Sequence, residues 1–102
     1  MLYMVIEHFH PGAAPEIYRR ARERGRQLPA GLDYIDSWVD VEYRRCFQLM
    51  RTDDPQLLEQ WIAHWQDLIQ FEVVPVRPSR EAAEKMSDHR ARRPGRKSDR
   101  LD

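Results

Sequence analysis

The chain has 102 residues, of which 41% are hydrophobic and 10% are aromatic, a size and composition typical of one globular domain. No apolar run approaches the roughly 20 residues of a membrane-spanning helix, so no membrane partner is expected. The N-terminal residues lack the basic region and the small-residue cleavage site of a secretory signal. The only cysteine, Cys46, cannot form an internal disulfide, which favours a cytoplasmic location.

The charge is distributed unevenly along the chain. Residues 1–76 contain 8 Arg, no Lys and 12 Asp or Glu, whereas residues 77–102 contain 9 Lys or Arg and 5 Asp or Glu. The first part therefore carries −4 and the second +4. An acidic body argues against a nucleic-acid groove in the folded part, so no specific nucleic-acid partner is expected. A weak, salt-sensitive attraction of the basic segment to polyanions stays open.

The first elements are a strand, a helix and a second strand. Leu2–Phe9 is an apolar run rich in β-forming residues, which predicts a strand. Pro15 opens a pattern with apolar residues at three- and four-residue spacing, which predicts an amphipathic helix, and Gly25 is its expected C-terminal cap. Alternation over residues 32–41 predicts the second strand.

The remaining elements are a strand, a helix and a last strand. Arg45–Arg51 predicts the third strand, and its short link to the second strand predicts a hairpin. Asp54 followed by Pro55 is a typical helix start. The helix after it carries an apolar stripe made of Leu57, Leu58, Trp61, Ile62, Trp65, Leu68 and Ile69. Phe71–Val76 predicts the fourth strand, and its Pro75 indicates an edge strand.

This order predicts an α+β fold of the ferredoxin-like βαββαβ class, with two helices on one face of a four-stranded antiparallel sheet. The domain is expected to span residues 1–78. Residues 79–86 can form a short helical extension. Residues 87–102 are expected to be a disordered basic tail that folding does not need, because they offer almost no apolar area to bury.

Alternation also sorts the strand residues into two faces. The set expected under the helices is Tyr3, Val5, Glu7, Phe9, Ile35, Ser37, Val39, Phe47, Leu49, Phe71 and Val73. The set expected on the helix-free face is Met4, Ile6, His8, Tyr34, Asp36, Trp38, Cys46, Gln48, Met50, Glu72 and Val74. The second set is too apolar for a solvated sheet surface, so a homodimer that covers this face is expected.

The chain resembles the bacterial domain-of-unknown-function 3303 family over roughly residues 1–84. The residues that carry the resemblance are Met4–Glu7, Arg22–Arg26, Gly31–Leu32, Asp36–Trp38, Arg45–Met50, Asp53–Pro55, Trp61, Trp65 and Phe71–Val76. The resemblance implies a fold similar to the dimeric α/β barrels, an architecture used by cofactor-free monooxygenases and small isomerases. It implies no catalytic residue and no reaction.

A small-molecule cleft is predicted on the helix-free face, and no cofactor is expected. Its candidate catalytic residues are His8, Asp36, Gln48 and Glu72, and its candidate ligand-binding residues are Trp38, Tyr34 and Met50. Ionisable groups inside strands are suited to proton transfer when burial shifts their pKa. The alternative is that Asp36 and Glu72 form structural ion pairs with Arg45 or Arg51 across the dimer.

Other candidates have a structural interpretation that weighs against a functional one. His8 and His10 have a spacing that suits metal ligands, but no further ligand follows at a familiar distance, and no metal site is predicted. Cys46 is interpreted as a small core residue rather than a nucleophile. Trp61 and Trp65 are interpreted as core residues in the first place, and as an aromatic ligand-binding box only in the second. The arginines of the first helix form a solvated face or an anion site.

Two classes of function therefore compete. One is a ligand-binding protein or a cofactor-independent enzyme, and the other is a non-catalytic dimerisation or protein-interaction module. Polar groups on a face built only for association would add a desolvation cost, which favours the first class. The presence of a cavity distinguishes the two.

Overall fold

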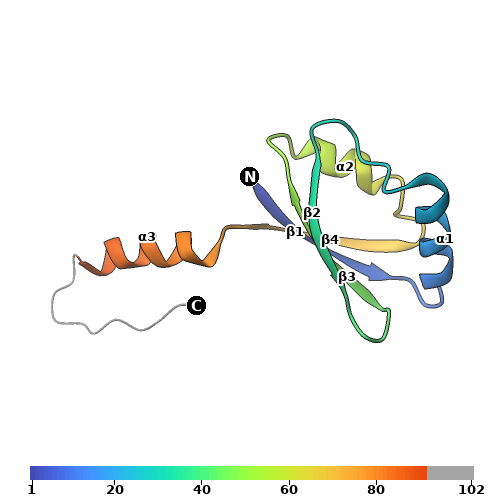
Figure 1. Ribbon diagram of the computed structural model, residues 1–102, viewed down its shortest axis with the longest axis horizontal. Coiled ribbons are helices and arrows are strands. Elements are labelled where there is room, and N and C mark those ends of the chain that lie inside the picture. The colour runs from blue at the N-terminus through green and yellow to red at the C-terminus, as the bar shows by residue number, and fades with distance from the viewer. Residues whose placement is uncertain (92–102) are drawn as a thin grey trace.

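The computed structural model describes residues 1–91 (Figure 1). The elements are β1 (Leu2–Phe9), α1 (Ala14–Arg24), β2 (Asp33–Val39), β3 (Arg45–Arg51), α2 (Gln56–Ile62), β4 (Ile69–Val76) and α3 (Ser79–Ala91). The four strands form one antiparallel sheet in the order β2-β3-β1-β4. This is the expected ferredoxin-like arrangement, and Pro75 lies on an edge strand as predicted.

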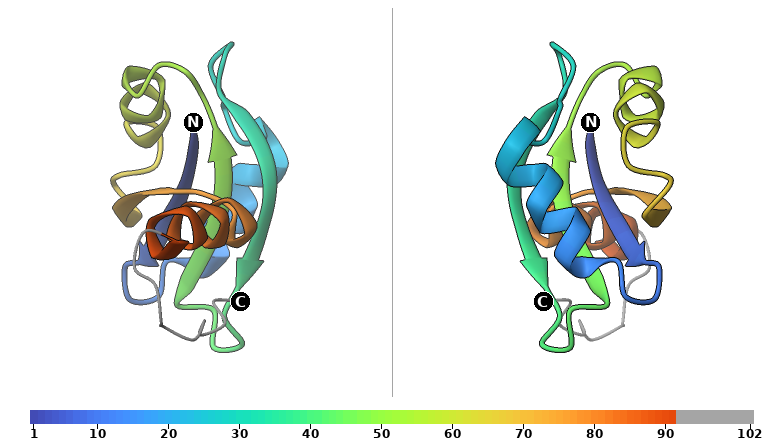
Figure 2. Two further views of the ribbon diagram at one scale, coloured as in Figure 1. Left: turned by 90° about the vertical axis from the view of Figure 1, so that its left-hand side faces the viewer. Right: turned by 90° about the vertical axis from the view of Figure 1, so that its right-hand side faces the viewer.

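Helices α1 and α2 lie on the same side of the sheet, and the core lies between them and the strands (Figure 2). The largest fully buried side chains are Trp61, Met50 and Val5. Trp61 also meets Phe71 edge to face, with ring centroids 5.4 Å apart. One helix residue and side chains from three neighbouring strands, β3, β1 and β4, therefore anchor the core.

The helix ends follow the local sequence. Pro15 occupies the first turn of α1, where its missing N–H costs no hydrogen bond. Gly25 closes the helix with φ 66° and ψ −164°, a conformation that is essentially restricted to glycine, and its N–H donates to the Ala21 carbonyl. At the start of α2 the Asp54 carboxylate accepts the Gln56 N–H at 3.0 Å, as the predicted helix start requires.

The register of β3 overturns the predicted division of its side chains between the faces. Met50, Gln48 and Cys46 lie opposite Tyr3, Val5 and Glu7 of β1, on the side of the helices. Their exposed fractions are 0%, 4% and 6%. Phe47 and Leu49 instead lie on the helix-free face. Both sets in β3 combine apolar and polar character, so alternation alone could not decide which one is buried.

A bulge in β2 corrects the predicted position of Tyr34. Tyr34 pairs with Met50, but the next paired residue is Asp36, opposite Leu49, so Ile35 is the additional residue. Tyr34 therefore lies on the helix side, whereas Ile35, expected under the helices, is 40% exposed. Ser37 and Val39 stay on the helix side as predicted, and Asp36 and Trp38 stay on the helix-free face.

Helix α2 ends earlier than the apolar stripe predicts. The helix stops at Ile62, and turns cover residues 63–68 before β4 begins at Ile69. The turns are closed by backbone hydrogen bonds such as Trp65 N–H to the Ile62 carbonyl, at 2.9 Å. Leu68 and Ile69 therefore do not belong to the helix, although both pack against the core. An apolar spacing that suits a helix also suits compact turns over a buried surface.

Helix α3 leaves the body on the side of the sheet opposite α1 and α2 and stands clear of it (Figures 1 and 2). It continues to Ala91, beyond the predicted end at residue 86. Glu81 lies within 3.7 Å of Arg77 and 4.0 Å of Lys85, both at four-residue spacing. The helical extension predicted over residues 79–86 is therefore longer in the structure, and these ion pairs lie just before and within its first half. The remainder of the predicted disordered tail, 92–102, lies outside the described residues.

Candidate active site

A cavity of about 290 Å³ lies between α1 and the sheet, on the helix-covered face. Its lining is mostly apolar and aromatic, with a few polar groups: Glu7, Phe9, Ile17, Tyr18, Ala21, Gly25, Arg26, Ser37, Val39, Cys46, Gln48, Trp61, Trp65 and Ile69. The buried members form the floor. Tyr18 and Val39 are 39% and 37% exposed, so they lie at the mouth. A mostly apolar cavity with a few polar groups at defined positions is typical of a small-molecule binding site.

Glu7 is the most perturbed acid of the cavity. Its side chain comes from the middle of β1, points to the helix side and is only 7% exposed. Burial raises the pKa of the Glu7 carboxyl from 4.5 to about 7, although the Cys46 thiol and the charge of Arg26 counteract the effect. A carboxyl with this pKa can both accept and release a proton near neutral pH, as a general acid or base must.

Cys46 supports Glu7 and is not itself activated. The two residues are paired across β1 and β3, and the neighbouring thiol lowers the pKa of the Glu7 carboxyl. Burial, with the nearby charge of Glu7, raises the pKa of Cys46 to about 12. The thiolate is therefore scarce at neutral pH, and a thiolate is what nucleophilic catalysis needs. This agrees with the prediction that Cys46 is a small buried residue.

Arg26 lies at the mouth of the cavity, directly after the end of α1. Its backbone carbonyl accepts the indole N–H groups of both Trp61, at 3.0 Å, and Trp65, at 3.1 Å. Its guanidinium carbon lies 3.6 Å from the centre of the Tyr34 ring. Two indoles therefore fix its backbone and one phenol ring supports its charge.

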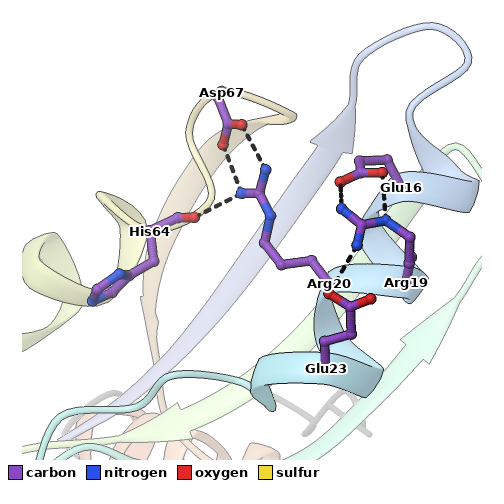
Figure 3. Close-up of polar contacts among 6 residues, drawn as sticks. All are labelled: Glu16, Arg19, Arg20, Glu23, His64 and Asp67. Atoms are coloured by element: carbon purple, nitrogen blue, oxygen red, sulfur yellow. Dashed lines mark hydrogen bonds and ion pairs between the residues drawn. The ribbon is translucent and has the colours of Figure 1, made fainter.

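Arg20 joins α1 to the turn that follows α2, beside the cavity (Figure 3). Its guanidinium donates to both carboxylate oxygens of Asp67, at 2.9 and 2.8 Å, and to the His64 carbonyl at 3.0 Å. The same group lies 5.5 Å from the centre of the Trp65 ring. This pair lowers the pKa of Asp67. It also holds Trp65, a wall of the cavity, against α1.

The structure separates the predicted site residues into two groups. Gln48 lines the cavity and donates to the Met50 sulfur at 3.4 Å, and Tyr34 lies beneath Arg26. Gln48, Met50 and Tyr34 therefore lie on the helix side of the sheet rather than on the predicted helix-free face.

The other four candidates, His8, Asp36, Trp38 and Glu72, are on the helix-free face as predicted. The imidazole Nε2 of His8 lies 3.3 Å from the Glu72 carboxylate, and both side chains are partly exposed. A catalytic role for His8, Asp36 and Glu72 and a ligand-binding role for Trp38 stay predictions.

Sequence reasoning placed Glu7 under the helices but omitted it from the predicted site. It also interpreted Trp61 and Trp65 as core, whereas they are both core and cavity wall. The available signal was the single acid of the largely apolar strand Leu2–Phe9, on the same face as Tyr3 and Val5. Arg26 carried no comparable signal, because it belongs to a run of arginines that mostly face solvent.

Among residues 1–91, which the structure describes, no three His, Cys, Asp or Glu side chains gather closely enough to hold a metal ion. None of the helices in this part of the chain is long and apolar enough to cross a membrane.

The family model described as a domain of unknown function, DUF3303, matches residues 1–90. The chain belongs to this family. The resemblance deduced from the sequence is thereby confirmed, and the match extends past residue 84 to include nearly all of α3. Among the curated proteins, none matches the chain.

A solved structure described as a putative antibiotic biosynthesis monooxygenase from Chloroflexus aurantiacus J-10-fl is similar to this DUF3303 chain. The two are 19% identical, the similarity covers 76% of this chain and 96% of the other, and the TM-score is 0.42. A similarity at this level transfers no activity.

Proposed function

We propose that this DUF3303 protein is a cytoplasmic homodimer that binds a small, mostly apolar molecule in the cavity between α1 and the sheet. Glu7 exchanges a proton with the bound molecule, without a cofactor. The observation that carries the proposal is a carboxyl with a pKa of about 7 on the wall of an open, largely apolar cavity. Perturbed acids in such cavities are typical of proton-transfer sites.

The helix-free face supports the homodimer. Trp38 is 52% exposed there and Val74 36%, and Met4, Ile6 and Phe47 beside them are half-buried. A second copy of the same face would cover this apolar area in a closed two-fold assembly. Since the cavity lies on the other side of the sheet, it stays open in such a dimer.

A thermal-shift screen of single-ring compounds tests the binding site. Ala21 lies on α1 and lines the cavity, so Ala21→Phe would fill it. A compound at ten times its Kd should stabilise the wild-type protein by about 1.4 kcal/mol, which is several degrees of Tm, and should not stabilise Ala21→Phe. Ala63→Phe, at an exposed position after α2, should respond like the wild type.

The proposal fails if no compound raises the Tm of the wild-type protein. It fails equally if the compounds that do so stabilise Ala21→Phe as well, because they would then bind elsewhere.

Proton transfer at Glu7 is tested by deuterium exchange. For a bound compound with an acidic C–H group, the wild-type protein in D₂O should accelerate exchange at that carbon, and proton NMR follows the loss of the signal. Glu7→Gln should slow the exchange by about 100-fold, the usual contribution of a general base. Glu59→Gln, at an exposed position on α2 outside the cavity lining, is the matched control and should leave the rate unchanged. Equal rates in the wild type and Glu7→Gln would remove the proton-transfer step from the proposal.

A further inference from the structure

Arg26 differs from the arginines around it in lining the cavity and stacking on a ring. Several arginines of the described residues lie within 4.0 Å of a carboxylate, namely Arg19, Arg20, Arg44, Arg45, Arg51 and Arg77. Within the part of the chain that the structure describes, Arg22, Arg24 and Arg26 have no such ion pair, and of these three it is Arg26 that lines the cavity and rests on the Tyr34 ring. Its charge acts on Glu7 and Cys46 from a distance, lowering the pKa of both groups. A cation at a cavity mouth is therefore available for a ligand.

The position of this cation is fixed by the fold. Gly25 turns the chain at the end of α1, and the Arg26 carbonyl then receives both indole N–H groups of α2 and its following turn. The guanidinium rests on the Tyr34 ring at 3.6 Å. A stacked guanidinium keeps its planar edge of N–H donors free, and that edge matches the two oxygens of a carboxylate.

We propose that Arg26 selects ligands with an apolar body and one carboxylate, the apolar part occupying the cavity and the carboxylate pairing with the guanidinium at its mouth. This inference rests on the proposed function, because it names the substrate class of that same cavity. A cavity of about 150 Å³ holds a benzene molecule, so a volume of about 290 Å³ has room for one ring with a short acidic side chain.

The geometry also gives the two charged groups different roles. Glu7 lies on the buried floor and Arg26 at the exposed mouth. A ligand held by its carboxylate at Arg26 therefore directs its apolar part, and any acidic C–H group close to the ring, toward Glu7. Arg26 is thus a positioning and specificity residue, whereas Glu7 is the group that meets the reacting proton.

Isothermal titration calorimetry on the full chain tests the inference with three matched pairs of probes. These are benzoate with benzamide, phenylacetate with phenylacetamide, and 3-phenylpropionate with 3-phenylpropanamide. In the wild-type protein the carboxylate of the best pair should bind about tenfold tighter than the amide, the size expected for a charge-assisted pair. Arg26→Gln should abolish this preference and leave the Kd of the amide unchanged. Arg24→Gln, which removes the same charge from the end of α1 outside the cavity lining, should keep the preference.

The outcomes separate this inference from the proposed function. If amides and carboxylates bind the wild type equally, or if Arg26→Gln keeps the preference, Arg26 does not select carboxylates and the cavity remains a binding site. If none of the six probes binds the wild type, both proposals are overturned. Arg26→Gln retains the backbone carbonyl that Trp61 and Trp65 need, and an unchanged Tm would verify that the fold is intact.

Discussion

Glu7 is a carboxyl that the fold buries, so that its ionised form is unfavourable. Its side chain is 7% exposed, and its pKa of about 7 is a measure of the desolvation that ionisation would cost. The neighbouring Cys46 thiol and the more distant Arg26 offset only part of that cost. A purely structural role would be served as well by an amide or an apolar residue at this position. The buried carboxyl therefore lowers the stability of the fold at neutral pH, and it provides an acid that can exchange its proton.

The pKa of Glu7 predicts how stability depends on pH. Its value is about 7 in the folded chain and 4.5 as the reference for the unfolded chain, so the folded state holds the proton more tightly. The stability that this proton provides is fully present below pH 4.5 and is lost as the pH rises through 7. The difference corresponds to about 3 kcal/mol. Urea unfolding should show Glu7→Gln gaining about this much relative to the wild type between about pH 4 and pH 8.

The charged and titratable groups around Glu7 are Cys46 from β3, Arg26 after α1 and Tyr18 on α1. They are present in both proteins, so the comparison isolates the carboxyl. Glu59→Gln, at an exposed position on α2 outside the cavity lining, should follow the wild-type pH profile. Parallel profiles for Glu7→Gln and the wild type would mean that Glu7 ionises normally and that its assignment as the acid–base group is wrong.

At the scale of single elements, the sequence predicted the strands and helices well and the faces of two strands poorly. Arg45–Arg51 was located correctly, because its flanking turns are clear. Which of its faces is buried depends on the hydrogen-bonded register with β1, and both faces offer large apolar side chains. The cavity of the proposed function consequently lies on the other side of the sheet from the predicted cleft, and Gln48 and Tyr34 lie on the side of the cavity.

The bulge in β2 is a second feature that alternation cannot reveal. A single extra residue, Ile35, reverses the direction of every side chain on one side of it. Tyr34 reaches the helix side, where its hydroxyl lies 2.7 Å from the Ser37 hydroxyl and its ring lies beneath Arg26. The bulge thus supplies the ring that supports the proposed carboxylate-binding residue. No local sequence pattern around Ile35 signals it.

At the scale of the whole molecule, the βαββαβ order was predictable because each element has its own turn or cap and its own apolar period. What covers the helix-free face could not be predicted from one chain, because it depends on a second molecule. Helix α3 bears on the same question. A helix of 13 residues is marginal on its own in water, and this one stands clear of the body on the side of the exposed sheet face. A second protomer docked on that face would offer α3 a surface to pack against.

The homodimer is tested by placing a charge on this face. Trp38 lies on the helix-free side of β2 and is 52% exposed, so Trp38→Glu should cost the isolated chain little, yet it would bury an unpaired carboxylate in the proposed interface. Size-exclusion chromatography with light scattering should give twice the chain mass for the wild type and a single chain mass for Trp38→Glu. Val41→Glu introduces the same charge at a residue that is 94% exposed in the loop between β2 and β3, and it should remain dimeric. A monomeric wild type at high micromolar concentration, or equal masses for the two variants, would show that the apolar sheet face is not the site of self-association.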